Sequence, residues 1–271
     1  MTTNETDGFA IVTAELTRRF GTLTAVDHIK LQVSYGEIFG LLGANGAGKS
    51  TLIKMLTTLL PPTSGAAEVG GFDIIRSPDR VRRRIGYVSQ LLSADGALTG
   101  FENLRLSAKL YDIPKREMGA RIDNALEFMG LVDSADKLVR TYSGGMIRRL
   151  ELAQAMLHRP AILFLDEPTI GLDPVARRTV WDRLLDLRRD YGMTVLITTH
   201  DMEEAEELCD SLAILHRGQV SIVGKPDDLR AGLGEDATMD DVFVHYAGGS
   251  IQDSGTFREV AQTRRTAHRL G

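Results

Sequence analysis

Gly43-Ala44-Asn45-Gly46-Ala47-Gly48-Lys49-Ser50-Thr51 is the stretch of the 271-residue chain that decides its fold. It has one glycine, four variable residues and then Gly-Lys-Ser. The apolar residues 38–42 before it predict a buried strand, and the apolar residues of 52–56 recur at helical spacing. A strand, a glycine loop and a helix together turn backbone amides and a helix N-terminus toward one anion. The stretch therefore predicts a phosphate-binding loop.

The loop also carries the two side chains that nucleotide phosphates need. Lys49 is placed to reach β- and γ-phosphates, and the Ser50 hydroxyl is placed to bind Mg²⁺. The alternative is a glycine-rich turn that binds nothing. The Lys-Ser pair in register and the two flanking apolar segments favour the phosphate site.

Composition excludes several other classes. The net charge of −5 gives no electrostatic reason to expect a nucleic-acid partner. No apolar run is long enough to span a bilayer, and the polar residues 1–8 do not resemble a signal peptide, so we expect a cytoplasmic protein. Cys209 is the only cysteine, which excludes an intrachain disulfide. The basic run of Arg80 and Arg82–Arg84 is typical of a solvated face, with a phosphate or lipid contact as the alternative.

A second motif places two carboxylates at the end of an apolar strand. Residues 162–165 are all apolar, as expected in a parallel sheet covered on both faces, and Asp166 and Glu167 follow at the carboxyl edge. The phosphate loop lies at the same edge. Asp166 is placed to hold Mg²⁺, and Glu167 is placed to polarise a water molecule. The alternative is a pair of solvated acids at a strand end.

Three further positions carry groups that suit a nucleotide site: Phe20, the triplet Ser143-Gly144-Gly145, and His200. The triplet opens a helix with a hydroxyl and free amides, although the same residues also form common turns. His200 follows an apolar strand, where it could bind a terminal phosphate or be an ordinary surface or core residue. Phe20, in the loop between two strands, could stack on a base or fill the core.

The chain order predicts an α/β fold in several parts. Residues 9–16 and 26–33 alternate as antiparallel strands, and residues 68–75 are strand-like. Thr99 and Glu102 predict a capping box for a helix over 101–111, and a second helix is expected over 117–129. A helix over 175–190, a strand over 193–198, paired strands over 211–215 and 219–222 and a short helix over 238–247 follow. Glu203, Glu204, Glu206 and Glu207 are expected on a solvated helix face.

These elements predict four regions. Residues 1–8 are expected to be disordered, and residues 9–235 to form the nucleotide domain, with a helical insert at about 91–158. Residues 236–271 are a C-terminal extension with a basic tail of Arg258, Arg264, Arg265 and Arg269. The nucleotide domain combines a mostly parallel sheet with an N-terminal antiparallel β layer.

In this order the motifs resemble those of the ATP-binding subunit of an ABC transporter. Residues 43–51 resemble the Walker A motif, and residues 162–167 resemble the Walker B motif. Gln90 resembles the Q-loop glutamine, and Ser143-Gly144-Gly145-Met146 resembles the signature motif. Gly171-Leu172-Asp173 resembles the D-loop, and His200 resembles the switch histidine. The resemblance implies ATP and Mg²⁺ as ligands. It makes Lys49, Glu167 and His200 catalytic and places Ser50, Gln90 and Asp166 at the metal. It places the adenine on Phe20, and it adds Ser143, Gly144, Gly145 and Asp173 to the nucleotide site.

The signature departs from the usual Leu-Ser-Gly-Gly-Gln. Here Tyr142 precedes Ser143, and Met146 replaces the glutamine and removes its amide. This variant, with Arg148-Arg149, Asp241-Val242-Phe243 and Arg264-Arg265, resembles the daunorubicin/doxorubicin-resistance branch of ABC exporters. The resemblance implies export of drugs, antibiotics or other hydrophobic compounds.

The family resemblance also implies partners. Two copies, or paired cassettes, would meet head to tail with ATP between the phosphate loop of one and the Ser143 helix of the other. A separate membrane-spanning permease would hold the chain at the cytoplasmic face of the membrane. One alternative is a soluble ABC-family ATPase acting on ribosomes or DNA, but the chain has neither tandem cassettes nor a coiled-coil insert. Another is a regulatory module without turnover, which the presence of Glu167 and His200 disfavours.

Overall fold

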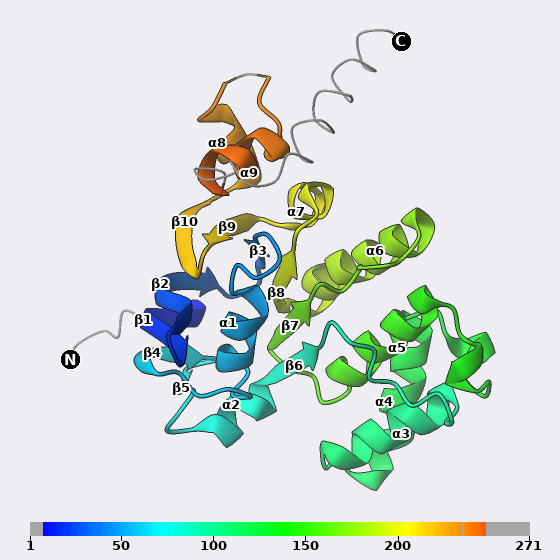
Figure 1. Cartoon of the computed structure of the whole chain (residues 1–271). Coiled ribbons are helices and arrows are strands. Elements are labelled where there is room, and N and C mark those ends of the chain that lie inside the picture. Colours follow the sequence, from blue (N-terminus) through cyan, green and yellow to red (C-terminus); the bar gives the residue numbers. More distant parts are fainter. Residues whose placement is uncertain (1–7, 235, 248–271) are drawn as a thin grey trace, which may run out of the picture.

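The computed structural model describes residues 8–234 and 236–247 (Figure 1). Residues 1–7, which carry most of the predicted N-terminal disorder, and the predicted basic tail lie outside the described residues. The described part contains a central six-stranded sheet, a four-stranded antiparallel sheet beside it and a group of helices on the other side. No helix in this part is both long and apolar enough to cross a bilayer.

The central sheet has the strand order β10-β9-β3-β8-β7-β6. Its strands are β3 (Ile38–Leu42), β6 (Ile85–Val88), β7 (Ile162–Asp166), β8 (Thr194–Thr199), β9 (Ser211–His216) and β10 (Gln219–Gly224). All neighbours pair in parallel except β9 and β10, which form the predicted hairpin. Every residue of β3, β7 and β8 is buried, as apolar strands covered on both faces should be. The predicted mostly parallel sheet is confirmed.

The antiparallel sheet has the order β2-β1-β4-β5. Its strands are β1 (Phe9–Phe20), β2 (Leu23–Ser34), β4 (Ser64–Val69) and β5 (Phe72–Asp73). The prediction of a long loop carrying Phe20 is wrong, because β1 and β2 continue to a tight turn and Phe20 ends β1. The predicted strand over 68–75 is instead a hairpin, turned by Gly70 and Gly71 with φ of 59° and 79°.

The helices of the described part include every predicted helix, with shifted ends, and two that were not predicted, over residues 78–84 and 226–231. They are α1 (Lys49–Leu56), α2 (Pro78–Arg84), α3 (Gly100–Leu110), α4 (Lys115–Phe128), α5 (Gly144–Met156), α6 (Pro174–Tyr191), α7 (Met202–Leu208), α8 (Pro226–Ala231) and α9 (Met239–Ala247). Short 3₁₀ turns at Val132–Ser134 and Val139–Thr141 precede α5. The capping box of Thr99 and Glu102 at α3 is confirmed. Between β6 and β7 the chain is helical, and α3, α4 and α5 form a lobe at one side of the sheet (Figure 1).

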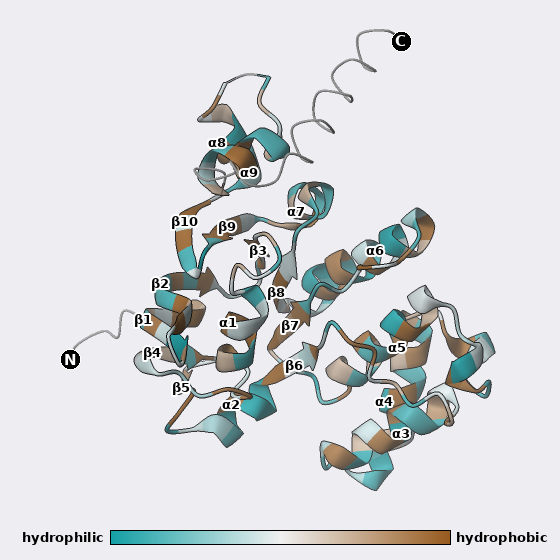
Figure 2. Ribbon diagram, viewed as in Figure 1, coloured by the Kyte–Doolittle hydropathy of each residue, from teal (hydrophilic) through white to brown (hydrophobic). Residues whose placement is uncertain are grey.

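Two apolar clusters cover the two faces of the central sheet. Ile38 and Leu42 of β3 belong to the cluster formed with α5, α6 and the helical lobe. Phe39 and Leu41, which point the opposite way, belong to the cluster formed with α1 and the antiparallel sheet. Figure 2 shows the strands as mostly hydrophobic ribbon between these layers. Polar side chains at the carboxyl ends of the strands therefore gather at one edge of a rigid, apolar sheet.

Candidate functional site

The phosphate loop is held tightly because two of its glycines have no room for a side chain. A Cβ on Gly48 would lie 2.4 Å from the Ala25 carbonyl oxygen, and the φ of Gly48 is 109°. A Cβ on Gly43 would lie 2.7 Å from the Leu215 carbonyl oxygen. Helix α1 begins directly afterwards at Lys49, so its first backbone amides have no partner within the helix and favour an anion.

The remaining loop residues surround this helix start. Ala44, Asn45 and Gly46 are exposed, Ala47 is buried, and Ser50 and Thr51 are partly buried in the first turn of α1. The Ala47 amide donates to the Ala44 carbonyl oxygen at 3.1 Å, which closes the tip of the loop. The predicted loop residues thus lie together between β3 and α1.

Lys49 folds back under the loop. Its side chain is buried, and Nζ donates to the carbonyl oxygens of Gly43 at 2.6 Å and Ala44 at 3.3 Å. Nζ also lies 3.2 Å from Oε1 of Glu167. The cation therefore lies between the loop and the catalytic acid predicted from the sequence, where an anionic phosphate could replace these oxygen partners.

Ser50 and Asp166 are brought together as predicted. Ser50 Oγ donates to Asp166 Oδ1 at 3.1 Å, and Thr198 Oγ1 of β8 donates to the same oxygen at 2.7 Å. Asp166 is only 3% exposed. One hydroxyl and one carboxylate suit Mg²⁺, which binds few protein oxygens and completes its shell with water and substrate phosphates. The described residues hold no cluster of three or more acidic, histidine or cysteine ligands that could bind a metal without a substrate.

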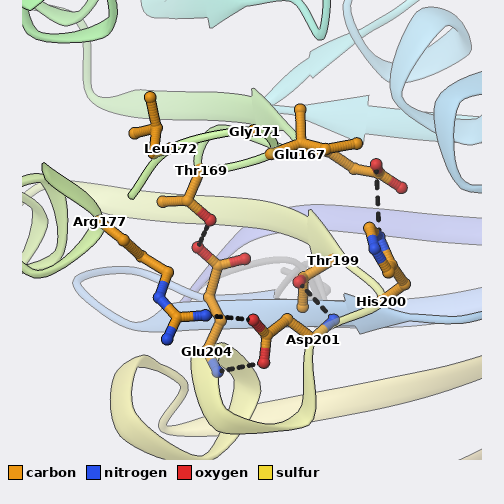
Figure 3. Close-up of a pocket in the computed structure, with 10 residues that line it drawn as sticks. Glu167, Thr169, Gly171, Leu172, Arg177, Thr199, His200, Asp201 and Glu204 are labelled. Carbon is orange, nitrogen blue, oxygen red and sulfur yellow. Dashed lines mark hydrogen bonds and ion pairs between the residues drawn. The ribbon is translucent and has the colours of Figure 1, made fainter. Parts of the chain in front are cut away.

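Glu167 adopts a left-handed backbone conformation with φ of 49°. Its amide donates to the carbonyl oxygen and to Oγ1 of Thr198, at 3.1 and 3.0 Å. The carboxylate is buried between Lys49 and His200, whose Nδ1 lies 3.4 Å from Oε2 (Figure 3). A left-handed conformation costs a non-glycine residue about 1–3 kcal/mol, so the surrounding structure must hold Glu167 in place. The structure thus brings Lys49, Glu167 and His200 together.

A pocket of about 170 Å³ opens beside Glu167 and His200. Its wall includes Thr169, Arg177 and Glu204 (Figure 3). Arg177 donates to Asp201 at 2.7 Å and to Glu203 at 2.7 Å, so the mouth of the pocket is charged. The pocket extends the site from the edge of the sheet toward α6 and α7.

Glu204 corrects one sequence prediction. Glu203, Glu206 and Glu207 are exposed as expected, but Glu204 is only 1% exposed. Its Oε1 accepts hydrogen bonds from Thr169 Oγ1 at 2.6 Å and Trp181 Nε1 at 2.9 Å. Burial raises the pKa of Glu204, and the hydrogen bonds from Thr169, Thr199 and Trp181 oppose that rise. The available signal was helical spacing, because Glu204 lies one turn before the apolar Leu208.

Glu204 therefore links two loops of the site. Thr169 lies two residues after Glu167, and Thr199 lies one residue before His200. The Thr169 hydroxyl donates to the Glu204 carboxylate, and the Thr199 hydroxyl helps to lower the pKa of that carboxyl group. The sequence motifs named the two catalytic candidates but not the buried acid that joins their segments.

The signature residues lie elsewhere on this chain. Ser143 caps α5, where its hydroxyl accepts from the Met146 amide at 3.3 Å, and both Ser143 and Gly144 are exposed. A Cβ on Gly145 would lie 2.7 Å from that of Ala176 in α6. Asp173 caps α6 and accepts from the amides of residues 175 and 176 at 3.0 and 2.9 Å. Ser143 and Asp173 therefore act as helix caps within one copy.

Gln90 and Phe20 are both exposed. Gln90 follows β6, and its carbonyl oxygen accepts from Arg148 Nη2 at 3.2 Å. The Phe20 side chain is 45% exposed, with the Arg18 guanidinium carbon 4.6 Å from the ring centre. One face of the ring thus carries a cation.

The phosphate loop, the Ser50–Asp166 pair and the acid beside His200 define a P-loop nucleotide-hydrolysing protein. The family profile described as ABC transporter matches residues 26–170, over half of the chain. The chain therefore belongs to the ABC transporter family. Within this family it is a nucleotide-binding subunit and an ATPase, as predicted.

Relatives and solved structures agree with this assignment. The chain is 44% identical over 231 residues to the daunorubicin resistance ATP-binding protein DrrA3 of Streptomyces coeruleorubidus, covering 85% of this chain and 72% of that protein. It is 44% identical over 225 residues to the daunorubicin/doxorubicin resistance ATP-binding protein DrrA of Streptomyces peucetius, covering 83% and 68%. The structure of cbiO1 from Clostridium perfringens, described as part of the ABC transporter complex cbiONQ, has a TM-score of 0.76 at 28% identity and covers 83% of this chain and 91% of that one. The predicted fold class and the resemblance to the resistance branch are confirmed.

Proposed function

We propose that this ATPase powers a membrane transporter that exports drugs, antibiotics or other hydrophobic compounds. The observation that carries the hydrolytic part is the buried Glu167 carboxylate, held between Lys49 and His200 at the carboxyl edge of the sheet. Similarity to two daunorubicin-resistance ATP-binding proteins supports the export part. These relatives do not favour the alternative of a ribosome- or DNA-directed ATPase.

The nucleotide would bind along the phosphate loop. The amides at the start of α1 and Lys49 would hold the β- and γ-phosphates, and the adenine would stack on the ring face of Phe20 away from Arg18. Ser50, Gln90 and Asp166 would hold Mg²⁺, which supplies positive charge to the phosphate oxygens when it is bound.

Catalysis then depends on the position of the Glu167 carboxylate. Binding of the phosphates by Lys49 would release Glu167 from its 3.2 Å ion pair. The freed carboxylate would orient the attacking water molecule and accept its proton, while His200 binds the γ-phosphate. The amide bonds to Thr198 fix the backbone of Glu167 against the sheet, so the carboxylate keeps its direction.

The other half of each site would come from a second copy. Ser143 and Gly144 are exposed at the start of α5, where a hydroxyl and free amides suit a phosphate. We assign Ser143, Gly144, Gly145 and Asp173 to the nucleotide bound by the phosphate loop of a head-to-tail partner. A dimer of this kind would exclude water from the transferring group.

A membrane-spanning permease is the expected third component, with this chain at the cytoplasmic face. Leu91 and Leu92 follow Gln90 and are 80% and 56% exposed. Exposed leucines beside the predicted Q-loop suit the apolar face of a permease helix. Co-purification with a multi-span membrane protein would support this reading, whereas a ribosome-bound pool would contradict it.

Glu167→Gln tests the assigned chemistry. Because glutamine cannot accept the proton of the attacking water, we expect ATP turnover to fall at least about 100-fold while ATP binding and an ATP-dependent dimer persist. Steady-state hydrolysis, nucleotide binding and size-exclusion chromatography measure the three properties. Glu206→Gln on the surface of α7 is the matched control and should hydrolyse ATP normally. Wild-type turnover in Glu167→Gln would refute the role of Glu167.

A further inference from the structure

Helix α5 buries an ion pair close to its exposed start. Arg148 is 2% exposed and Glu151 is 3% exposed, and Arg148 Nη1 lies 2.9 Å from Glu151 Oε2. Exposed pairs three residues apart on a helix contribute little stability, and a buried pair also has a large desolvation cost. Burial accordingly lowers the pKa of the Arg148 guanidinium, and the Glu151 charge opposes that change. A gain in folding stability is therefore, by itself, a poor explanation for the burial of this ion pair.

Both residues of the pair also form hydrogen bonds with one loop. Arg148 Nη1 donates to the Ser89 carbonyl oxygen at 2.8 Å, and Nη2 donates to that of Gln90 at 3.2 Å. Glu151 Oε1 accepts from the Ser93 amide and from Ser93 Oγ, the latter at 3.1 Å. The pair thus holds the loop on both sides of the exposed residues 91–92.

This loop leads directly to the catalytic edge. Val88 of β6 pairs with Leu165 of β7, so Gln90 follows its strand at the same edge as Asp166. The pair fixes the backbone of Gln90 and leaves its side chain exposed. The same helix begins at Ser143, five residues before Arg148. Arg148 and Glu151 therefore connect the predicted Q-loop to the helix that presents the signature serine.

We propose that Arg148 and Glu151 are positioning residues that make residues 89–93 and helix α5 move as one body. The position of Gln90 at the nucleotide of this copy is then coupled to the position of Ser143 at the nucleotide of the partner. The inference rests on the proposed function, because it needs Gln90 and Ser143 to act on ATP. A planar guanidinium suits this task, since it bonds two consecutive carbonyl groups and a carboxylate at once.

The double variant Arg148→Met/Glu151→Leu removes the polar links and keeps the packing volume. Replacing a whole buried ion pair with apolar side chains is often neutral for stability. We expect the melting temperature to change little, amide hydrogen exchange at 89–93 to become about tenfold faster, and the KM for Mg-ATP to rise about tenfold. Exchange followed by mass spectrometry, with steady-state kinetics at varied Mg²⁺, gives these values.

Glu117→Leu/Arg121→Met is the matched control in the same helical lobe. Arg121 lies 2.7 Å from Glu117 and also donates to the Leu157 carbonyl oxygen at 3.1 Å. This pair has the same chemistry but does not touch residues 89–93. The control should leave exchange at 89–93 and the KM at wild-type values.

Arg148→Lys keeps the positive charge but loses the planar, forked guanidinium group. It is the second test variant, for use if the double variant does not fold. Lysine cannot bond both carbonyl groups and Glu151 in the same geometry, so the KM should rise with little loss of stability. A variant that folds and keeps the wild-type KM and loop exchange would overturn the inference, as would changes equal to those of the control. That result would leave the Glu167→Gln result unaffected, so the two proposals fail separately.

Discussion

The buried carboxyl group of Glu204 makes the stability of the fold depend on pH. Its pKa is raised above 4.5, chiefly by burial. Between the unfolded and the folded pKa, the folded chain binds more protons than the unfolded chain, so stability falls as pH rises through that interval. Above the folded pKa, the ionised carboxylate keeps its full desolvation cost.

The Glu204→Gln variant should lose this dependence. Glutamine has no charge to bury, so we expect its melting temperature to fall less than that of the wild type when the pH rises from 4.5 to 7.5. Thermal unfolding by circular dichroism across this range measures the difference. Glu207→Gln, on the exposed face of the same helix, should follow the wild-type curve. Parallel curves for Glu204→Gln and the wild type would contradict the raised pKa.

At the residue scale, the sequence could predict the groups that belong to a local pattern. Lys49 and Ser50 are fixed by the glycine loop, and Asp166 and Glu167 by the end of an apolar strand. Glu204 and the Arg148–Glu151 pair belong to no such motif, because their burial depends on segments that are distant in sequence; helical spacing was the one local signal, and only for Glu204. Charged residues are seldom fully buried, so composition alone favoured an exposed position.

At the element scale, the ends of the buried parallel strands were predictable and the ends of the N-terminal antiparallel strands were not. A strand covered on both faces is a plain apolar run, so β3 was expected over residues 38–42, which form it. In β1 and β2 the register shifts repeatedly, and Glu15 and His28 both have φ of 51°. Such bulges interrupt the alternation of polar and apolar side chains on which the prediction rests. The first strand was therefore expected to end too early and the second to begin too late.

The capping box of α3 gives a prediction for an element. Thr99 Oγ1 accepts from the Glu102 amide at 3.1 Å, and the Glu102 side chain accepts from the Thr99 amide at 2.9 Å. Thr99→Ala removes one of these bonds, so we expect a loss of about 0.5–2 kcal/mol in the free energy of unfolding. Urea unfolding measures it, with Thr179→Ala as a control away from a helix start. Equal stability of Thr99→Ala and the wild type would show that the cap is dispensable.

At the scale of the whole molecule, the proposed nucleotide site is divided between copies. The phosphate loop lies at the sheet edge, and Ser143 stands exposed at the start of a helix in the lateral lobe (Figure 1). In the proposed dimer each copy gives its phosphate loop to one site and its helix start to the other, so a damaged loop on one copy and a damaged helix start on the other fall in the same site.

Mixing two inactive chains tests this division. In a Glu167→Gln background, Lys49→Ala and Ser143→Arg should each fail to retain ATP alone. A mixed dimer keeps one site with both intact halves, so the mixture should retain labelled ATP at about one quarter of the sites if the chains pair at random. Gel filtration of differently tagged chains measures retention and confirms mixed pairing. Mixed dimers that retain no ATP would contradict the arrangement.

The left-handed backbone of Glu167 has a consequence for how this protein can change. Glycine adopts that conformation without steric cost and asparagine at reduced cost. Selection for thermal stability alone would therefore favour glycine or asparagine at position 167, and under the catalytic role proposed for Glu167 the selected variants would not hydrolyse ATP. Thermal stability and ATP turnover therefore favour different residues at position 167, and only a screen that selects for both would retain the glutamate.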